Sequence, residues 1–159
     1  MPASRGGLLL RVAVVGLALA TAAAVAVVLA LRVPPRSPGG GWVRGAAVSV
    51  VRDRGVVFVP EAGAFLVSTG PAHVVAFSDR TPHLGERLRY CPTSGWFEDP
   101  AHGAKFDGLG RYALGPALRG MDRLALEILN GVAWVDPTRV TPGLPKGTPT
   151  TPPAGPFCV

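Results

Sequence analysis

Residues 81–119 carry two histidines, each a short distance after a residue with a side-chain oxygen. The first group is Thr81-x-His83, and the second, after fifteen intervening residues, is Asp99-x-x-His102. Two imidazoles and one carboxylate form the ligand set of many mononuclear sites for Fe(II) or Zn(II). These residue types therefore predict one of two things: a single-metal site made by His83, His102 and Asp99, or two loops whose histidines only form hydrogen bonds.

Strands are expected to hold these groups, because short apolar runs separated by Gly and Pro flank them. Four runs precede the first group, with a turn predicted at residues 52–55: Val48–Val51, Val56–Val59, Phe65–Val67 and His73–Phe77. Asn130-Gly131 joins two later runs, Arg123–Leu129 and Val132–Val135. Asn-Gly between apolar runs is a strong hairpin signal. Short β-branched runs of this kind predict an antiparallel β-sandwich or barrel.

A long uncharged segment lies near the N-terminus. The twenty residues from Val12 to Leu31 carry no charge and, at about 1.5 Å per residue, reach roughly the 30 Å thickness of a bilayer core. A cleaved signal peptide is the alternative, but its apolar region is usually about 7–15 residues long. We therefore predict an N-terminal flank at residues 1–11, a transmembrane helix at 12–32 and a Pro- and Gly-rich tether at 33–47. Arginines lie on both sides of the segment, so charge does not decide its orientation.

The charge of the chain argues against one class of partner. The net charge is +6 and the pI is near 10.4. The Lys and Arg residues are scattered, with no basic cluster interleaved with aromatics, so no nucleic-acid partner is expected. Anionic lipid headgroups or an acidic protein fit this surplus better. Residues 141–159 form a tail rich in Thr, Pro and Gly with too little apolar surface to fold alone, which places the folded domain at residues 48–140.

Short motifs along most of the chain carry a family resemblance. They are His83-Leu84-Gly85, Tyr90-Cys91, Trp96-Phe97, Pro100, His102-Gly103, Phe106-Asp107, Gly110, Gly115-Pro116-Ala117, Arg119–Arg123, Val135-Asp136 and Gly155–Val159. In these residues the domain resembles the Rieske iron–sulfur family. The whole chain resembles the membrane-anchored iron–sulfur subunits of actinobacterial-type quinol–cytochrome c reductases. The resemblance implies an all-β, Rieske-like antiparallel β-sandwich with two cluster-type loops, preceded by one N-terminal transmembrane helix.

The residues at the family's cluster positions depart from the family pattern. Rieske proteins hold a [2Fe–2S] cluster with two cysteine thiolates and two histidines. The thiolate positions correspond here to Thr81 and Asp99. A second cysteine pair, which links the two loops in the family, corresponds to Glu86 and Ala101. A Thr hydroxyl is a poor replacement for a thiolate, and one carboxylate does not replace two, so no cluster is expected here.

Cys91 and Cys158 are the only cysteines in the chain. One interpretation is two unrelated thiols, one buried and one on the tail. The other is a disulfide that ties the tail back beside the altered loops. Both positions match cysteines of the family pattern, and an even count in an exported domain favours pairing. The resemblance therefore implies the disulfide.

Together these features predict a single-pass cell-membrane protein with its β domain on the extracytoplasmic side. We expect a cluster-less accessory or structural subunit that packs against a cytochrome b-type or other subunit of a respiratory complex. The family belongs to oxidoreductase complexes, and the missing ligands leave open whether this chain takes part in catalysis. Two alternatives stay open. One is a working [2Fe–2S] subunit that oxidises menaquinol, and the other is a single-Fe or single-Zn protein that uses His83, His102 and Asp99.

Overall fold

The computed structural model describes residues 21–25, 37–71 and 73–159. The chain divides into two units, Met1–Arg36 and Ser37–Val159. Of the first unit only Thr21–Val25 is described, and this stretch is helical. The predicted flank at 1–11 and most of the predicted membrane span at 12–32 lie outside the described residues. Within those residues, no helix combines the length and the hydropathy needed to cross a bilayer.

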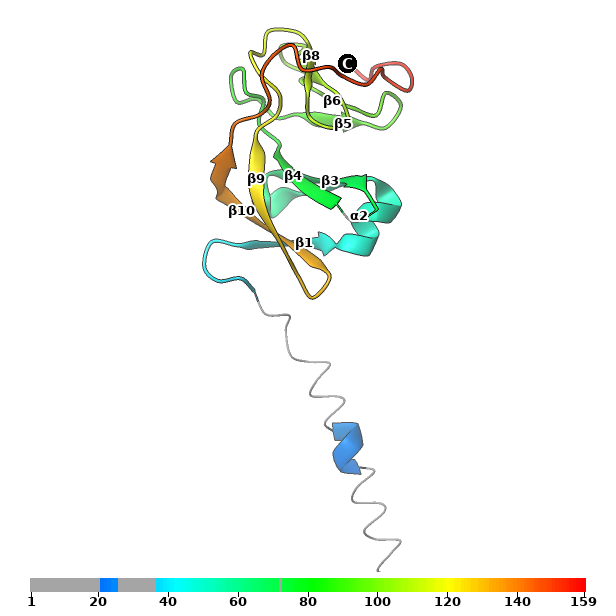
Figure 1. Ribbon diagram of the computed structural model, residues 1–159, viewed down its shortest axis with the longest axis vertical. Helices are drawn as coiled ribbons and strands as arrows, with labels where there is room; N and C mark the ends of the chain where they lie inside the picture. The colour runs from blue at the N-terminus through cyan, green and yellow to red at the C-terminus, as the bar shows by residue number, and fades with distance from the viewer. Residues whose placement is uncertain (1–20, 26–36, 72) are drawn as a thin grey trace, which may run out of the picture. The chain divides into compact units, whose positions relative to one another are not determined.

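Two antiparallel sheets make up the described part of the second unit, and Figure 1 shows them one above the other. The larger sheet has the strand order β1-β10-β9-β4-β3-β2. Its strands are β1 (Val43–Ala47), β2 (Val56–Val59), β3 (Ala64–Gly70), β4 (His73–Ser78), β9 (Arg123–Leu129) and β10 (Val132–Thr141). A single 3₁₀ turn, η1 (Pro60–Ala62), connects β2 to β3. The mostly-β prediction is confirmed.

The smaller sheet is an insertion between β4 and β9 of the larger one. Its strand order is β5-β6-β7-β8, formed by β5 (Arg89–Cys91), β6 (Trp96–Glu98), β7 (Lys105–Phe106) and β8 (Tyr112–Leu114). The first candidate group lies just before this insertion and the second lies inside it, between β6 and β7. The C-terminal tail runs across the smaller sheet, in orange to red in Figure 1.

Two predictions near the start of the domain are wrong. Residues 43–47, predicted as part of the tether, form β1, which pairs with β10. The strand predicted at Val48–Val51, with a turn after it at residues 52–55, is also wrong: helix α2 (Val48–Arg54) covers this segment and ends at Gly55, which has a φ of 74°. Val48 and Val51 lie three residues apart, so on a helix they share one face, and both are buried there. Packing against the larger sheet thus overrides the β propensity of valine.

The first four residues of strand β3 are buried, and they take part in two hydrophobic cores on opposite faces of the strand. Leu66 belongs to the core that includes α2, whereas Phe65 and Val67 belong to the other, because successive side chains on a strand point to opposite faces. The second core also contains Phe97 and Phe106 of the smaller sheet. The ring centroids of Phe65 and Phe97 are 5.0 Å apart. This aromatic core joins the two sheets and fixes where the loops of the smaller sheet lie.

The predicted hairpin between β9 and β10 is confirmed. Asn130 and Gly131 have φ values of 53° and 74°. Positive φ at both positions is what a two-residue turn between antiparallel strands requires. Val132 pairs with Leu129 directly across this turn.

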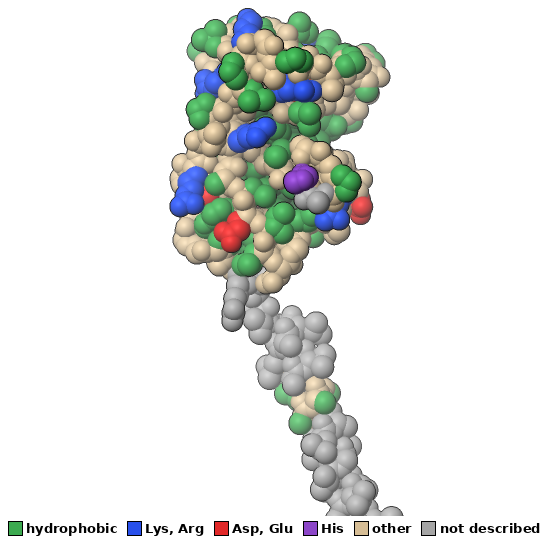
Figure 2. Space-filling model, in the orientation of Figure 1, with side chains coloured by type: hydrophobic (Ala, Val, Ile, Leu, Met, Phe, Trp, Pro, Cys, Tyr) green, Lys and Arg blue, Asp and Glu red, His purple; other side chains and the backbone are tan. Residues whose placement is uncertain are grey.

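Acidic and basic side chains are unevenly exposed around the smaller sheet. On the face drawn in Figure 2, Asp and Glu side chains appear only on the lower half, where Figure 1 places the larger sheet, while Lys and Arg appear on both halves. The acidic residues between positions 89 and 114 are Glu98, Asp99 and Asp107, and all three are buried. This part of the domain therefore presents mainly positive charge to its surroundings.

Candidate functional site: two histidine-bearing loops

The first loop, residues 80–88, joins β4 to β5 and is closed by its own main chain. The Thr81 amide donates to the Glu86 carbonyl at 2.8 Å, and the Gly85 amide donates to the Thr81 carbonyl at 3.1 Å. Thr81 is buried, and its Oγ1 accepts a hydrogen bond from the His83 amide at 3.4 Å. The hydroxyl at this position therefore stabilises the turn that carries the first histidine.

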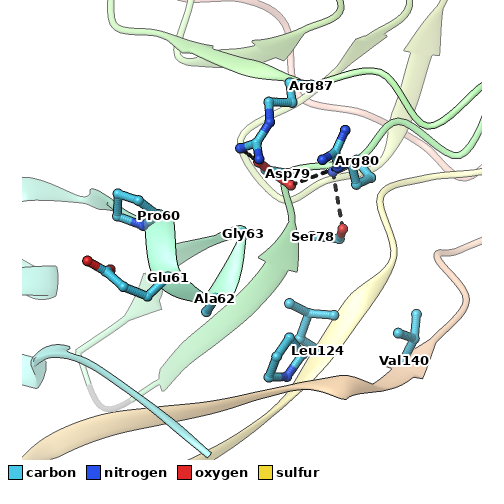
Figure 3. A pocket seen from close by; sticks show the side chains of 11 residues that line it. Pro60, Glu61, Ala62, Gly63, Ser78, Asp79, Arg80, Arg87, Leu124 and Val140 are labelled. Atoms are coloured by element: carbon cyan, nitrogen blue, oxygen red, sulfur yellow. Dashed lines mark hydrogen bonds and ion pairs between the residues drawn. The ribbon is translucent and has the colours of Figure 1, made fainter.

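An ion pair with the buried carboxylate of Asp79 links the two ends of this loop. Asp79 lies at its start, and the Nη1 atom of Arg87, from its far end, is 2.6 Å from Asp79 Oδ2. Arg80 Nε is 3.6 Å from the other oxygen, and Figure 3 shows both arginines around Asp79. Gly63 of the neighbouring turn leaves room for the carboxylate, since a Cβ there would lie 3.0 Å from Oδ1. The group borders a pocket of about 370 Å³.

The second loop, residues 99–104, connects β6 to β7 around Asp99. This residue is fully buried, and its Oδ1 accepts hydrogen bonds from the amides of Ala101 at 2.9 Å and His102 at 3.1 Å. The Gly103 amide donates to the Asp99 carbonyl at 2.9 Å. An aspartate that accepts from amides two and three residues ahead is a common way to stabilise a turn. Asp99 thus caps the turn that carries the second histidine.

The fold brings the two histidines together. The ring centroids of His83 and His102 are 5.4 Å apart and the rings meet edge to face, at 77°. His102 Nδ1 is 3.6 Å from Asp99 Oδ2. That oxygen is buried and has no hydrogen-bond partner among the described residues. Thr81, His83, Asp99 and His102, which the sequence singled out by spacing, therefore lie in one region of the domain.

These residues do not fit a [2Fe–2S] cluster. Thr81 and Asp99, which the resemblance places at the thiolate positions, offer oxygen and not sulfur, and each uses a side-chain oxygen to cap its own loop. Glu86 and Ala101, which the resemblance places at the positions of a loop-to-loop disulfide, are exposed and carry no sulfur. The donors that remain are two imidazoles and one carboxylate oxygen. Such donors suit a single divalent ion better than a cluster.

A disulfide binds the tail to the smaller sheet. Cys91 of β5 is joined to Cys158, with the two Cα atoms 5.7 Å apart, as the resemblance implied. Phe157 packs on Trp96 with ring centroids 5.5 Å apart. The Ala154 amide donates to the carbonyl of Ser94 at 2.9 Å. A segment with too little apolar surface to fold by itself thus folds on the surface of the domain.

Sequence reasoning missed the buried ion pair beneath this tail. Glu98 is 1% exposed and accepts hydrogen bonds from the amides of Cys158 at 3.1 Å and Val159 at 2.9 Å. The Nζ atom of Lys105 lies 3.5 Å from Glu98 Oε2 and also donates to the main-chain oxygen of Val159. No spacing motif marks this pair. The one available signal was a charged residue directly after the apolar pair Trp96-Phe97.

Asp107 holds the segment after β7 and the tail at the same time. Its Oδ1 accepts from the amides of Leu109 at 3.0 Å and Arg111 at 2.9 Å, and its Oδ2 accepts from Arg111 Nε at 2.7 Å and from the Thr151 amide at 3.0 Å. Burial raises the pKa of Asp107, but the hydrogen bonds from Arg111, Thr151 and Leu109 together outweigh burial and hold the pKa below its usual value. The carboxylate is therefore kept charged at this junction.

Comparisons with known proteins give similarity at the level of structure alone. No protein-family model matches the chain, and no curated protein matches its sequence. Among solved structures, it is similar to the plasma membrane Rieske protein PetC3 from the cyanobacterium Synechocystis PCC 6803, at 23% identity and a TM-score of 0.49, over 58% of this chain and 97% of that one. It is also similar to the soluble domain of the Rieske protein II (soxF) from Sulfolobus acidocaldarius, at 23% identity and a TM-score of 0.37, over 56% of this chain and 52% of that one. At these values neither likeness decides the activity or the cofactor of this chain.

Proposed function

We propose that this chain is a membrane-anchored, Rieske-like protein without a [2Fe–2S] cluster, which acts as an accessory or structural subunit of a respiratory membrane complex. The proposal depends on one observation: at the two positions where the family has thiolates, the side chains accept hydrogen bonds from their own loops. Thr81 Oγ1 accepts the His83 amide, and Asp99 Oδ1 accepts the amides of Ala101 and His102. In each loop a side-chain oxygen accepts hydrogen bonds from main-chain amides and stabilises the turn, so neither loop needs iron or sulfide to fold.

A structural role needs contacts with a partner, and exposed apolar side chains on two segments of the domain are available for them. Leu84, on the first loop, is 65% exposed, and Leu118, in the segment before β9, is 76% exposed. Burial of such side chains stabilises a contact by roughly 25 cal/mol per Å². We place a cytochrome b-type or other respiratory subunit against them, with the basic surface toward acidic groups or anionic lipid. In this proposal residues 12–32 anchor the chain in the cell membrane and the domain is extracytoplasmic.

Metal analysis of the full chain tests the absence of a cluster. The protein is purified in detergent without oxygen, and iron, zinc and acid-labile sulfide are measured per chain. We expect no iron and no sulfide, together with an unchanged melting temperature after treatment with a chelator. The matched comparison restores all four cysteines with Thr81→Cys, Glu86→Cys, Asp99→Cys and Ala101→Cys. Two irons and two sulfides in the unaltered chain would instead establish a [2Fe–2S] cluster and favour the alternative, an electron-transfer subunit that oxidises menaquinol.

The structural role is tested separately by co-purification. A tagged chain should bring down a cytochrome b-containing complex, identified by its haem spectrum. The double variant Leu84→Glu, Leu118→Glu should remove this association, while Glu86→Gln, an exposed change on the same loop, should leave it intact. Association that is unaffected by the leucine changes contradicts the proposed surface.

A second candidate function is a site for one divalent metal ion. The observation in its favour is the buried Asp99 Oδ2, which lacks a hydrogen-bond partner among the described residues and lies 3.6 Å from His102 Nδ1. His83 and His102 would be the ligands, and Asp99 would orient His102 through Nδ1, since the ligand atoms of these three residues do not all lie within 4.8 Å of one another. One Fe or Zn per chain without sulfide, lost in both His83→Ala and His102→Ala, would establish this function in place of the first.

A further inference from the structure

The disulfide lies beside a buried carboxylate, and the three side chains form a compact group. The Sγ atoms of Cys91 and Cys158 and a carboxylate oxygen of Glu98 all lie within 4.8 Å of one another. In the described part of the chain this is the one set of three such ligand atoms at that separation. We propose that reduction of the disulfide converts this group into a binding site for a thiophilic divalent metal ion, such as Zn²⁺, with two thiolates and one carboxylate as ligands.

The distances match what such an ion needs. Zinc binds thiolate sulfur at about 2.3 Å and carboxylate oxygen at about 2.0–2.2 Å, so tetrahedral ligands lie roughly 3.5–4 Å apart. A group contained within 4.8 Å reaches this arrangement with small side-chain movements. Thr93 Oγ1 is also close to both sulfur atoms, 3.1 Å from Cys91 Sγ and 3.6 Å from Cys158 Sγ. A fourth position is therefore open to this hydroxyl or to water.

The tail has other attachments that keep Cys158 in place when the sulfur–sulfur bond is broken. Phe157 remains packed on Trp96. The Cys158 amide donates to Glu98 at 3.1 Å, and the hydroxyl of Thr93 donates to the Pro156 carbonyl at 2.8 Å. The second thiol is thus held next to the first by contacts that do not depend on the bond between them.

Charge decides which ion the reduced site takes. Cys91 and Glu98 are each 1% exposed, and Lys105 is 9% exposed. In the disulfide state the carboxylate of Glu98 is balanced by the ammonium of Lys105, 3.5 Å away. Two thiolates would add two negative charges beside Glu98, and the one on buried Cys91 is costly when it is uncompensated. A dication neutralises the two thiolate charges. Soft thiolates select Zn²⁺, Co²⁺ or Cd²⁺ over Mg²⁺ or Ca²⁺. The ion can reach the site because Cys158 is exposed.

The chemistry balances with a dithiol as reductant. The dithiol attacks the Cys91–Cys158 bond, which breaks as it takes up the electron pair, and the dithiol leaves as its own disulfide. The protein is left with two thiols. Metal binding then forms two metal–sulfur bonds and releases two protons to solvent.

Cobalt titration tests the proposal. The full chain in detergent carries His83→Ala and His102→Ala, so that the histidine loops add no ligands, and it is reduced with a phosphine that does not compete for metal. We expect one Co²⁺ per reduced chain, with thiolate-to-cobalt charge-transfer absorption in the near ultraviolet that Zn²⁺ abolishes, and none in the oxidised chain. Cys158→Ser and Glu98→Gln should each weaken binding at least about tenfold.

Circular dichroism of the same samples shows whether reduction of the disulfide unfolds the tail, so that loss of binding can be told apart from loss of structure. If reduction disturbs the fold, Zn²⁺ should restore the spectrum of the reduced chain but not that of Cys158→Ser. Reduced chains that show no charge-transfer band, or equal binding by Cys158→Ser, overturn the proposal. Neither result bears on the cluster question, which is decided by iron and sulfide in the oxidised protein.

Discussion

Two substitutions of Asp99 separate its role as a loop cap from its pairing with His102. Asp99→Ala removes the acceptor of two main-chain hydrogen bonds, at 2.9 and 3.1 Å. Hydrogen bonds to charged groups contribute about 1.5–3 kcal/mol each. Because Ala101 and His102 are exposed and water can recover part of this loss, we expect the free energy of unfolding to fall by about 2–4 kcal/mol. Asp99→Asn keeps an oxygen at the Oδ1 position and should cost roughly 1 kcal/mol.

Urea and thermal unfolding of the full chain, followed by tryptophan fluorescence and circular dichroism, give these values. At this chain length 1 kcal/mol corresponds to a shift in melting temperature of about 2–4 °C, so Asp99→Ala should melt roughly 5–15 °C lower. Glu86→Gln is the matched control, since it alters an exposed side chain on the other loop and should stay within about 0.5 kcal/mol.

Two outcomes would refute this reasoning. If Asp99→Ala is as stable as the unaltered chain, the carboxylate does not hold the second loop, and the main support for a cluster-less fold is lost. If Asp99→Asn is as damaging as Asp99→Ala, the charge next to His102 matters more than the cap. That result would favour the single-metal function.

Three further predictions concern the tail and its anchors. Folding lowers the pKa of Asp107 from its ordinary value of 3.8, so its contribution to stability is complete above that value and is lost as pH falls through the folded pKa. The free energy of unfolding, measured as a function of acid pH, should therefore fall less steeply in Asp107→Asn than in the unaltered chain. Cys158→Ser opens a disulfide that spans 67 residues of sequence and should lower the free energy of unfolding by roughly 4 kcal/mol, measured in urea without reductant. Gly143→Ala places a Cβ 2.1 Å from the Gly120 carbonyl oxygen and should destabilise the chain by about 3 kcal/mol, whereas Gly40→Ala, with nothing within 4 Å, should be neutral in the same assay.

The sequence predicts the strands well where local signals suffice. The Asn130-Gly131 turn and the runs that became β3 and β4 have β-branched residues and clear boundaries. The segment that forms α2 lacks a comparable local signal, because four residues rich in valine are compatible with a strand and with a short helix equally well. What decides is the burial of Val48 and Val51 beside Leu66, which comes from a distant part of the chain. Long-range packing of this kind cannot be seen in a short window.

The same division holds for the candidate site. Residue type and spacing selected His83, His102 and Asp99, and these side chains do lie in one region. Spacing could not show that one oxygen of Asp99 caps the loop while the other is left without a partner. The buried ion pair of Glu98 and Lys105 could not be predicted from the sequence for a different reason. Its surroundings are completed by the tail, about sixty residues further along the chain, as in the hydrogen bond between Val159 and Glu98 at a separation of 61 residues.

The disulfide also determines what a single cut in the backbone does to the molecule. Because Cys91 and Cys158 are joined, every peptide bond between them belongs to a covalent ring. The second loop, at 99–104, is inside this ring, and the first loop, at 80–88, lies entirely before it. A protease that cuts the second loop opens the ring but leaves one molecule, while a cut before Cys91 in the first loop releases two. Electrophoresis with and without reductant would therefore tell which of the two loops a protease reached.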